Sequence, residues 1–352
     1  MMKKILFSFS IILLLVSRIF PGFADWYSTN VYPVWVKTTG RLTGIFPFSV
    51  VEILLYMTTA VVIFTGVRLV VGIIRKKKGK KEAFTWLSNL LSFVVVLFFL
   101  YTLNCGVNYH RASFAETSGL QVREYTADEL KAVCQWLTEE INEKSSQVKR
   151  DSNGVMELPD ASGEKAVQAM QALGGSYAEM AGYYPQPKGL LFPFILSVQN
   201  LSGVYSPFTV EANYNTAMTD YNIPFTMCHE LSHLRGFMQE QEANFIAYLA
   251  CMESDNAEFQ YSGSMLGWIY CMNVLYKADY EAWEEVRVQL SLEAETDLMA
   301  NREFWNRYDG ALAEVSNKVN DTYLKANGQA DGVKSYDRMV DLLVAYYYEK
   351  ER

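Results

Sequence analysis

The sequence predicts a mainly α-helical protein with N-terminal transmembrane helices followed by a helical α+β domain, which has a short sheet or hairpin before its central helix. Half of the 352 residues are apolar, and many gather in long runs within the first third. Of the 31 Lys/Arg and 39 Asp/Glu, residues 1–104 hold 12 and 3, which leaves 19 and 36 for the rest. Beyond that point apolar residues recur at helical spacing. We therefore predict a membrane region over 1–110 and a second domain over 111–352.

Three apolar segments lie in the membrane region, at about residues 5–24, 46–74 and 84–107. The second and third are long enough to cross a hydrocarbon core of about 30 Å. The first either crosses the bilayer or is a signal peptide cleaved after Ala24. The loop 75–81 between the second and third is almost entirely Lys and Arg, and a short loop this basic stays in the cytoplasm. We therefore expect a multi-pass protein in the lipid bilayer, with the residues beyond about Cys105 outside the cytoplasm.

The second domain is acidic, which argues against a nucleic-acid partner, because its charge repels phosphate groups. The five cysteines show neither CxxC nor zinc-ribbon spacing. Most of them fall in helical apolar patterns and are predicted to be buried thiols, and the sequence also allows one disulfide between two of them.

Elements of the second domain can be placed by periodicity and by start and stop signals. A capping box at Thr126 marks the start of the first helix, and Gly236 marks the end of the helix 224–235. The uncharged stretch 260–276 is too short and too polar for a further span, so we expect a buried core helix. The predicted helices cover about 126–141, 164–180, 224–235, 240–251 and 260–276, with a last one within 321–348.

An extended segment is predicted over 201–215, just before the helix 224–235. Its part 206–213 is either an ordinary hairpin or an edge strand that pairs with an extended substrate backbone.

The most specific pattern is His229-Glu230-Leu231-Ser232-His233, an HExxH sequence that holds two of the chain's three histidines. Positions i and i+4 share one helix face, so both imidazoles can bind one metal ion. Glu230 between them can take a proton from the attacking water. The pattern predicts a zinc site with His229 and His233 as ligands and Glu230 as general base.

A catalytic zinc needs a third protein ligand, and the helix that follows offers Glu240 and Glu242. They lie about 200° apart on a helix, so both cannot face the metal. The run 240–244 is similar to the E-x-x-A-D pattern of membrane-linked gluzincins. That resemblance implies Glu240 as the zinc ligand and Asn244 as a group that holds a histidine.

The whole chain resembles a family of bacterial membrane proteins, domain of unknown function 3810. The resemblance implies the bacterial cell membrane and a gluzincin-like zinc site in a zincin-like domain, and it supplies no substrate. The shared features are Tyr32-Pro33, Ile45–Ser49, the basic loop, Ser206–Thr209, His229–His233, Gly236-Phe237, Glu242–Phe245 and Tyr323–Lys325.

We therefore expect a membrane-anchored, zinc-dependent metallopeptidase that hydrolyses a peptide or amide bond outside the cytoplasm. Its partner would be a peptide or protein substrate, with the cell envelope as one source. The alternative is a non-catalytic envelope membrane protein with a structural or relic zinc site.

Overall fold

A computed structural model describes residues 1–20, 22–159, 162–332 and 338–350. The chain divides into two compact units, and each is described by itself. The N-terminal unit is Met1–Arg111 with Ser206–Glu211, and the second unit is Ala112–Tyr205 with Ala212–Arg352. The end of the N-terminal stretch falls one residue from the boundary expected at 110. The inclusion of 206–211 in that unit was not expected from the sequence.

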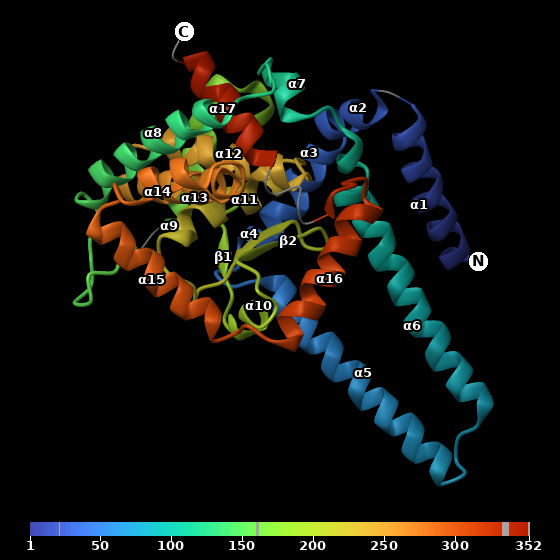
Figure 1. Ribbon diagram of the computed structural model, residues 1–352. Coiled ribbons are helices and arrows are strands. Elements are labelled where there is room, and N and C mark those ends of the chain that lie inside the picture. Colours follow the sequence, from blue (N-terminus) through green and yellow to red (C-terminus); the bar gives the residue numbers. More distant parts are fainter. Residues whose placement is uncertain (21, 160–161, 333–337, 351–352) are drawn as a thin grey trace. The chain divides into compact units, whose positions relative to one another are not determined.

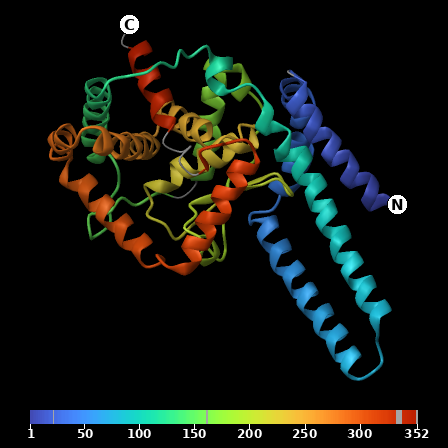
Figure 2. The same cartoon turned by 45° about the vertical axis from the view of Figure 1, so that its right-hand side comes forward.

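The N-terminal unit is dominated by α5 and α6, which form a long helical hairpin (Figures 1 and 2). Two stretches, Val50–Ile74 and Lys80–His110, are long and apolar enough to cross a membrane, and a third exists only if α1 and residues 23–44 count together. The helices of this unit are α1 (Met2–Ile19), α2 (Phe23–Asn30), α3 (Tyr32–Trp35), α4 (Arg41–Gly44), α5 (Val50–Ile74) and α6 (Lys80–Tyr101).

The segment 206–211 is tied to helices of the N-terminal unit by hydrogen bonds. Thr43 Oγ1 donates to the carbonyl of Thr209 at 3.0 Å. The buried carboxylate of Glu211 accepts the first two backbone N–H groups of α5 at 3.0 and 2.9 Å. A helix start leaves such N–H groups unpaired, so Glu211 caps α5 from a distant part of the chain.

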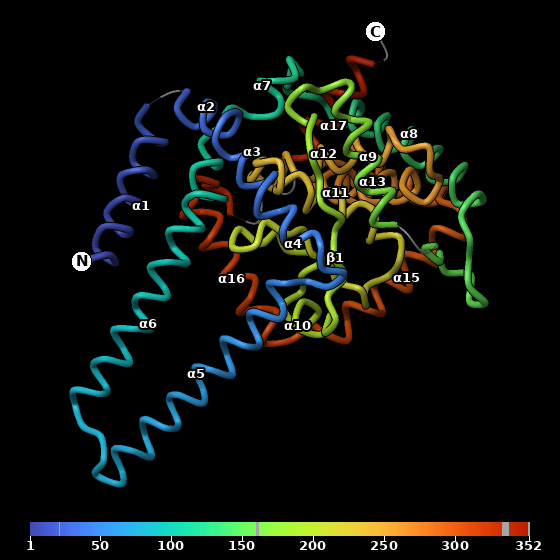
Figure 3. Tube along the Cα trace, turned by 180° about the vertical axis from the view of Figure 1, so that it is seen from behind, coloured from blue at the N-terminus to red at the C-terminus, as the bar shows by residue number. Residues whose placement is uncertain are grey.

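The second unit is a cluster of helices around α13, which the sequence predicted as a buried core helix. α13 packs against α8, α11, α12 and α17, and the cluster can be followed from behind in Figure 3. Thr126 and Glu129 form the predicted capping box of α8. The main helices are α8 (Ala127–Ser145), α9 (Ser162–Ser176), α11 (Asn222–Leu234), α12 (Glu240–Met252), α13 (Ala257–Ala278), α14 (Tyr280–Arg287), α15 (Leu292–Asn306), α16 (Ala311–Ala326) and α17 (Met339–Lys350).

A short sheet precedes α11 in the chain. Its strands are β1 (Lys188–Gly189), β2 (Gly203–Ser206) and β3 (Glu211–Tyr214), in the order β1-β3-β2, with β1 parallel to β3. Of the two alternatives for 206–213, the structure agrees with the hairpin, because β2 and β3 are neighbours in the sheet. β3 has neighbours on both sides, and β1 and β2 are the edge strands of this sheet.

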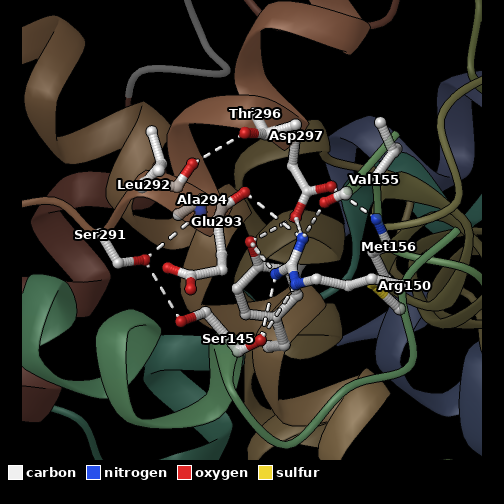
Figure 4. Close-up of polar contacts among 12 residues, drawn as sticks. Ser145, Arg150, Val155, Met156, Ser291, Leu292, Glu293, Ala294, Thr296 and Asp297 are labelled. Carbon is white, nitrogen blue, oxygen red and sulfur yellow. Dashed lines mark hydrogen bonds and ion pairs between the residues drawn. The ribbon is translucent and has the colours of Figure 1, made fainter. Parts of the chain in front are cut away.

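A buried ion pair fastens the loop after α8 to α15 and α13. Asp297 is fully buried, and its carboxylate accepts from Arg150 at 2.9 Å, from the Tyr261 hydroxyl at 2.6 Å and from the Met156 amide at 2.7 Å. Arg150 also donates to the carbonyl of Ser145 at the end of α8 (Figure 4). Every carboxylate oxygen thus has a partner, which a buried charge requires.

Candidate metal centre

Helices α11 and α12 carry the HExxH motif and the residues after it, and they pack against each other. Almost every residue of α11 is buried. Gly236 follows with a φ of +93°, a left-handed conformation that favours glycine and reverses the chain. Glu240 is then the first residue of α12. The predicted helices 224–235 and 240–251 are confirmed to within about two residues at each end.

This reversal brings three potential metal ligands together. Glu240 Oε2 lies 3.3 Å from His229 Nε2 and 3.7 Å from His233 Nε2. Their ligand atoms all lie within 4.8 Å of one another. Tetrahedral zinc with bonds of about 2.0–2.2 Å places ligand atoms roughly 3.3–3.6 Å apart, so this spacing suits one zinc ion.

Glu242, the other candidate for the third ligand, is engaged elsewhere. Its buried Oε1 accepts the backbone N–H of Phe114 at 2.9 Å. Phe114 begins the short helix α7 (Phe114–Ser118), where the carboxylate caps a free amide. Between the two glutamates, the structure therefore brings Glu240 to the histidines.

His233 is oriented by the backbone. Its Nδ1 lies 2.8 Å from the carbonyl oxygen of Phe237, which accepts a hydrogen bond when Nδ1 carries the proton. That tautomer leaves Nε2 free to bind a metal.

The expectation that Asn244 holds a histidine is wrong, because Asn244 Nδ2 donates to the Tyr270 hydroxyl at 3.2 Å. The sequence could not reveal Phe237 as the partner of His233, because the group that accepts the hydrogen bond is its main-chain carbonyl, which every residue has.

Glu230 is buried beside the cluster and is held from the sheet side. Its carboxylate accepts the backbone N–H of Tyr205 in β2. A Cβ at Gly203 would lie 2.5 Å from Glu230 Oε1, so only glycine leaves room at this point of β2. Glu230 Oε2 is buried and has no hydrogen-bond partner among the described residues. One carboxylate oxygen is therefore fixed while the other is available to a ligand.

A family model described as protein of unknown function (DUF3810) matches residues 27–344. The chain belongs to this family. That match confirms the family that the sequence motifs indicated, and it covers the three potential ligands and Glu230. No curated protein and no solved structure matches the chain. Since the description of the DUF3810 family names no activity, the chemistry has to be argued from the side chains.

The charges of the DUF3810 site favour a cation between the ligands. Burial lowers the pKa of His233, but the Glu240 carboxylate outweighs burial and raises the pKa to about 9. Burial would raise the pKa of Glu240, yet the two histidines bring it well below its usual range. For Glu230, burial dominates and raises the pKa to about 7, against the opposing effect of both histidines.

The donor set fits zinc on chemical grounds. Two imidazole nitrogens and one carboxylate are the ligands of a catalytic zinc that keeps its fourth position open. The cluster is mostly buried, with 10–12% of each ligand side chain exposed. The hydrogen bond that orients buried His233 suits a bound metal, and Glu230 Oε2, which has no partner in the described part of the chain, suits a polar ligand beside it.

Proposed function

We propose that this DUF3810 protein is a membrane-anchored zinc metallopeptidase that hydrolyses a peptide or amide bond outside the cytoplasm. The observation that carries the proposal is the buried Glu230 carboxylate beside His229, His233 and Glu240, with Oε2 left without a partner among the residues that the structure describes. A structural metal site has no use for an additional buried carboxylate, and burying a carboxylate with one oxygen unsatisfied costs free energy.

Each residue has a separate task in this proposal. His229, His233 and Glu240 would hold the metal. When bound, zinc acts as a Lewis acid that lowers the pKa of water and polarises a carbonyl oxygen. Glu230 Oε2 accepts the proton of the attacking water and then delivers it to the leaving amine nitrogen. The Tyr205 N–H fixes the carboxylate, so that the proton is accepted and released at one position.

The location of the reaction follows from the membrane segments. The basic loop 75–81 lies between the two candidate spans and is expected to stay in the cytoplasm. The chain after the second of these spans then begins on the opposite side, in the bacterial envelope. β2 is an edge strand that lies beside Glu230, which supports an extended peptide as substrate.

The test compares Glu230→Gln with wild type in the purified full-length protein. We expect the variant to keep its zinc and to lose about 10²–10⁴-fold in hydrolysis, the usual contribution of a general base. Zinc is measured by elemental mass spectrometry, and cleavage by mass spectrometry of a peptide library. Glu284→Gln, the same change at an exposed residue of α14, is the matched control and should alter neither the zinc content nor the rate of hydrolysis.

Two results would count against the proposal. A Glu230→Gln variant that cleaves at the wild-type rate would remove Glu230 as the base. A wild-type protein that binds zinc, yet cleaves nothing in peptide and amide libraries, would favour the alternative of a non-catalytic envelope protein with a structural zinc.

A further inference from the structure

The hairpin of α5 and α6 contains a pocket of about 350 Å³ near the loop that joins the two helices. Three of its lining residues are cationic: Arg68 on α5, Lys78 in the loop and Lys81 on α6. Glu82 is the acidic residue of the lining. We call this the basic pocket, and its charge suits an anion.

Lys78 and Glu82 are held in place by contacts within the hairpin, and Glu82 also interacts electrostatically with Lys78. The aliphatic chain of Lys78 lies so close to Gly72 that a Cβ there would be 2.5 Å from Lys78 Cδ. Lys78 Nζ donates to the carbonyl of Arg68 at 3.4 Å, so the ammonium group is turned back toward α5. Glu82 Oε2 instead accepts the Gly79 backbone N–H at 2.8 Å and caps the start of α6.

A second cavity, of about 460 Å³, continues from the basic pocket along the same two helices. The two cavities share Thr65, Trp86 and Asn89, and Trp86 Nε1 donates to Thr65 Oγ1 at 3.0 Å where they meet. We call it the apolar groove. Its remaining lining is almost entirely apolar: Leu54, Met57, Thr58, Val61, Val62, Leu90 and Phe93.

The two cavities together change from charged to apolar along the helix axis. Arg68 and Leu54 lie about 21 Å apart along α5, at 1.5 Å per residue. One leaflet contributes about 15 Å of the roughly 30 Å hydrocarbon core, and the headgroup region lies outside it. The pair of cavities therefore has the length and the polarity profile of one lipid in one leaflet.

We propose that the basic pocket and the apolar groove bind one anionic phospholipid, with the phosphate at Arg68, Lys78 and Lys81 and an acyl chain in the groove. Cationic residues at the ends of spanning helices attract anionic headgroups, whereas a zwitterionic headgroup gains little. A second copy of this chain would bring the same basic loop against the pocket, so like charges disfavour it as the occupant.

The test is a lipid titration of the full-length protein in a neutral detergent, followed by native mass spectrometry. Phosphatidylglycerol, phosphatidylcholine with the same acyl chains, and inorganic phosphate are compared. We expect phosphatidylglycerol to bind most tightly. Each cation contributes about fivefold near an anionic headgroup, so Arg68→Gln with Lys78→Gln should weaken that binding about 25-fold.

The matched control is Arg75→Gln with Lys77→Gln, which removes the same residue types from exposed positions of the same loop that do not line the pocket. It should weaken binding by less than about threefold. For the groove, Val62→Trp should reduce phosphatidylglycerol binding, and Val67→Trp on the exposed side of α5 should not.

Several results would overturn the proposal. Equal losses in the two charge variants would mean non-specific attraction to the loop. Equal binding of phosphatidylcholine would remove the role of the phosphate charge, and inorganic phosphate that competes fully would indicate a free anion as the ligand. A dimer that forms in place of the lipid complex would make a second copy the occupant.

Discussion

The buried ion pair between Arg150 and Asp297 offers a test of how the second unit is held together. Replacing Asp297 by alanine removes three hydrogen bonds at once and leaves the Arg150 guanidinium without its counter-charge. Asp297 is fully buried, and only 15% of the Arg150 side chain is exposed. Removing one partner of such a pair costs about 3–5 kcal/mol, because the remaining charge stays buried.

That free energy translates into a measurable change in thermal stability. A domain of 150–250 residues loses about 2–4 °C in Tm per kcal/mol, so Asp297→Ala should lower the Tm by roughly 6–20 °C. Arg150→Met combined with Asp297→Leu removes both charges and should recover part of the loss, because the Met156 amide and the Tyr261 hydroxyl still lack their acceptor. The recovery would separate the cost of an unpaired charge from that of altered packing.

The assay is thermal unfolding of the purified full-length protein, followed by tryptophan fluorescence. The neighbouring pair Lys149–Glu157, at 2.8 Å, is the control, because its side chains are 64% and 48% exposed. Glu157→Ala should lower the Tm by no more than about 4 °C, since exposed pairs contribute about 0–1 kcal/mol. A similar, small shift for Asp297→Ala would refute the argument from burial.

Two further predictions follow from close packing. Gly203→Ala would place a Cβ 2.5 Å from Glu230 Oε1 and 2.9 Å from the Asn213 carbonyl oxygen. We expect about 1–3 kcal/mol of destabilisation and slower hydrolysis, with zinc retained. The control is Gly175→Ala, whose Cβ meets nothing within 4 Å; it should be neutral or slightly stabilising in the same Tm and activity assays. All five cysteines are buried thiols outside any disulfide, and burial raises the pKa of the Cys251 thiol well above its usual range. A maleimide should therefore label none of them until the protein unfolds, and rapid labelling of the native protein would contradict this.

Local sequence signals predicted the elements around the site well. The HExxH spacing, Gly236 after it and the acidic start of the next helix indicated both helices and their reversal, because these signals act within a few residues. The capping box at Thr126 and the uncharged stretch 260–276 are also local signals, and they predicted the start of α8 and the buried helix α13. The cysteines are buried and form no disulfide, as the apolar periodicity predicted for most of them.

Long-range contacts account for the features that the sequence did not reveal. Glu240 and Glu242 both lie in the first turn of α12, and the structure adds that Glu242 binds the amide of Phe114, 128 residues earlier, while Glu240 lies at the histidines. Arg150 and Asp297 are 147 residues apart. The segment 206–211 reads as an extended strand, yet Glu211 caps α5 from 161 residues away. Partners of this kind are set by tertiary packing, which periodicity does not encode.

Metal content shows whether His229, His233 and Glu240 hold a zinc ion. Zinc is measured by elemental mass spectrometry in the purified full-length wild type and in Glu240→Ala and Glu242→Ala. We expect about one zinc per chain in the wild type and in Glu242→Ala, and its loss in Glu240→Ala. A folded wild-type protein without zinc, or a loss confined to Glu242→Ala, would contradict it.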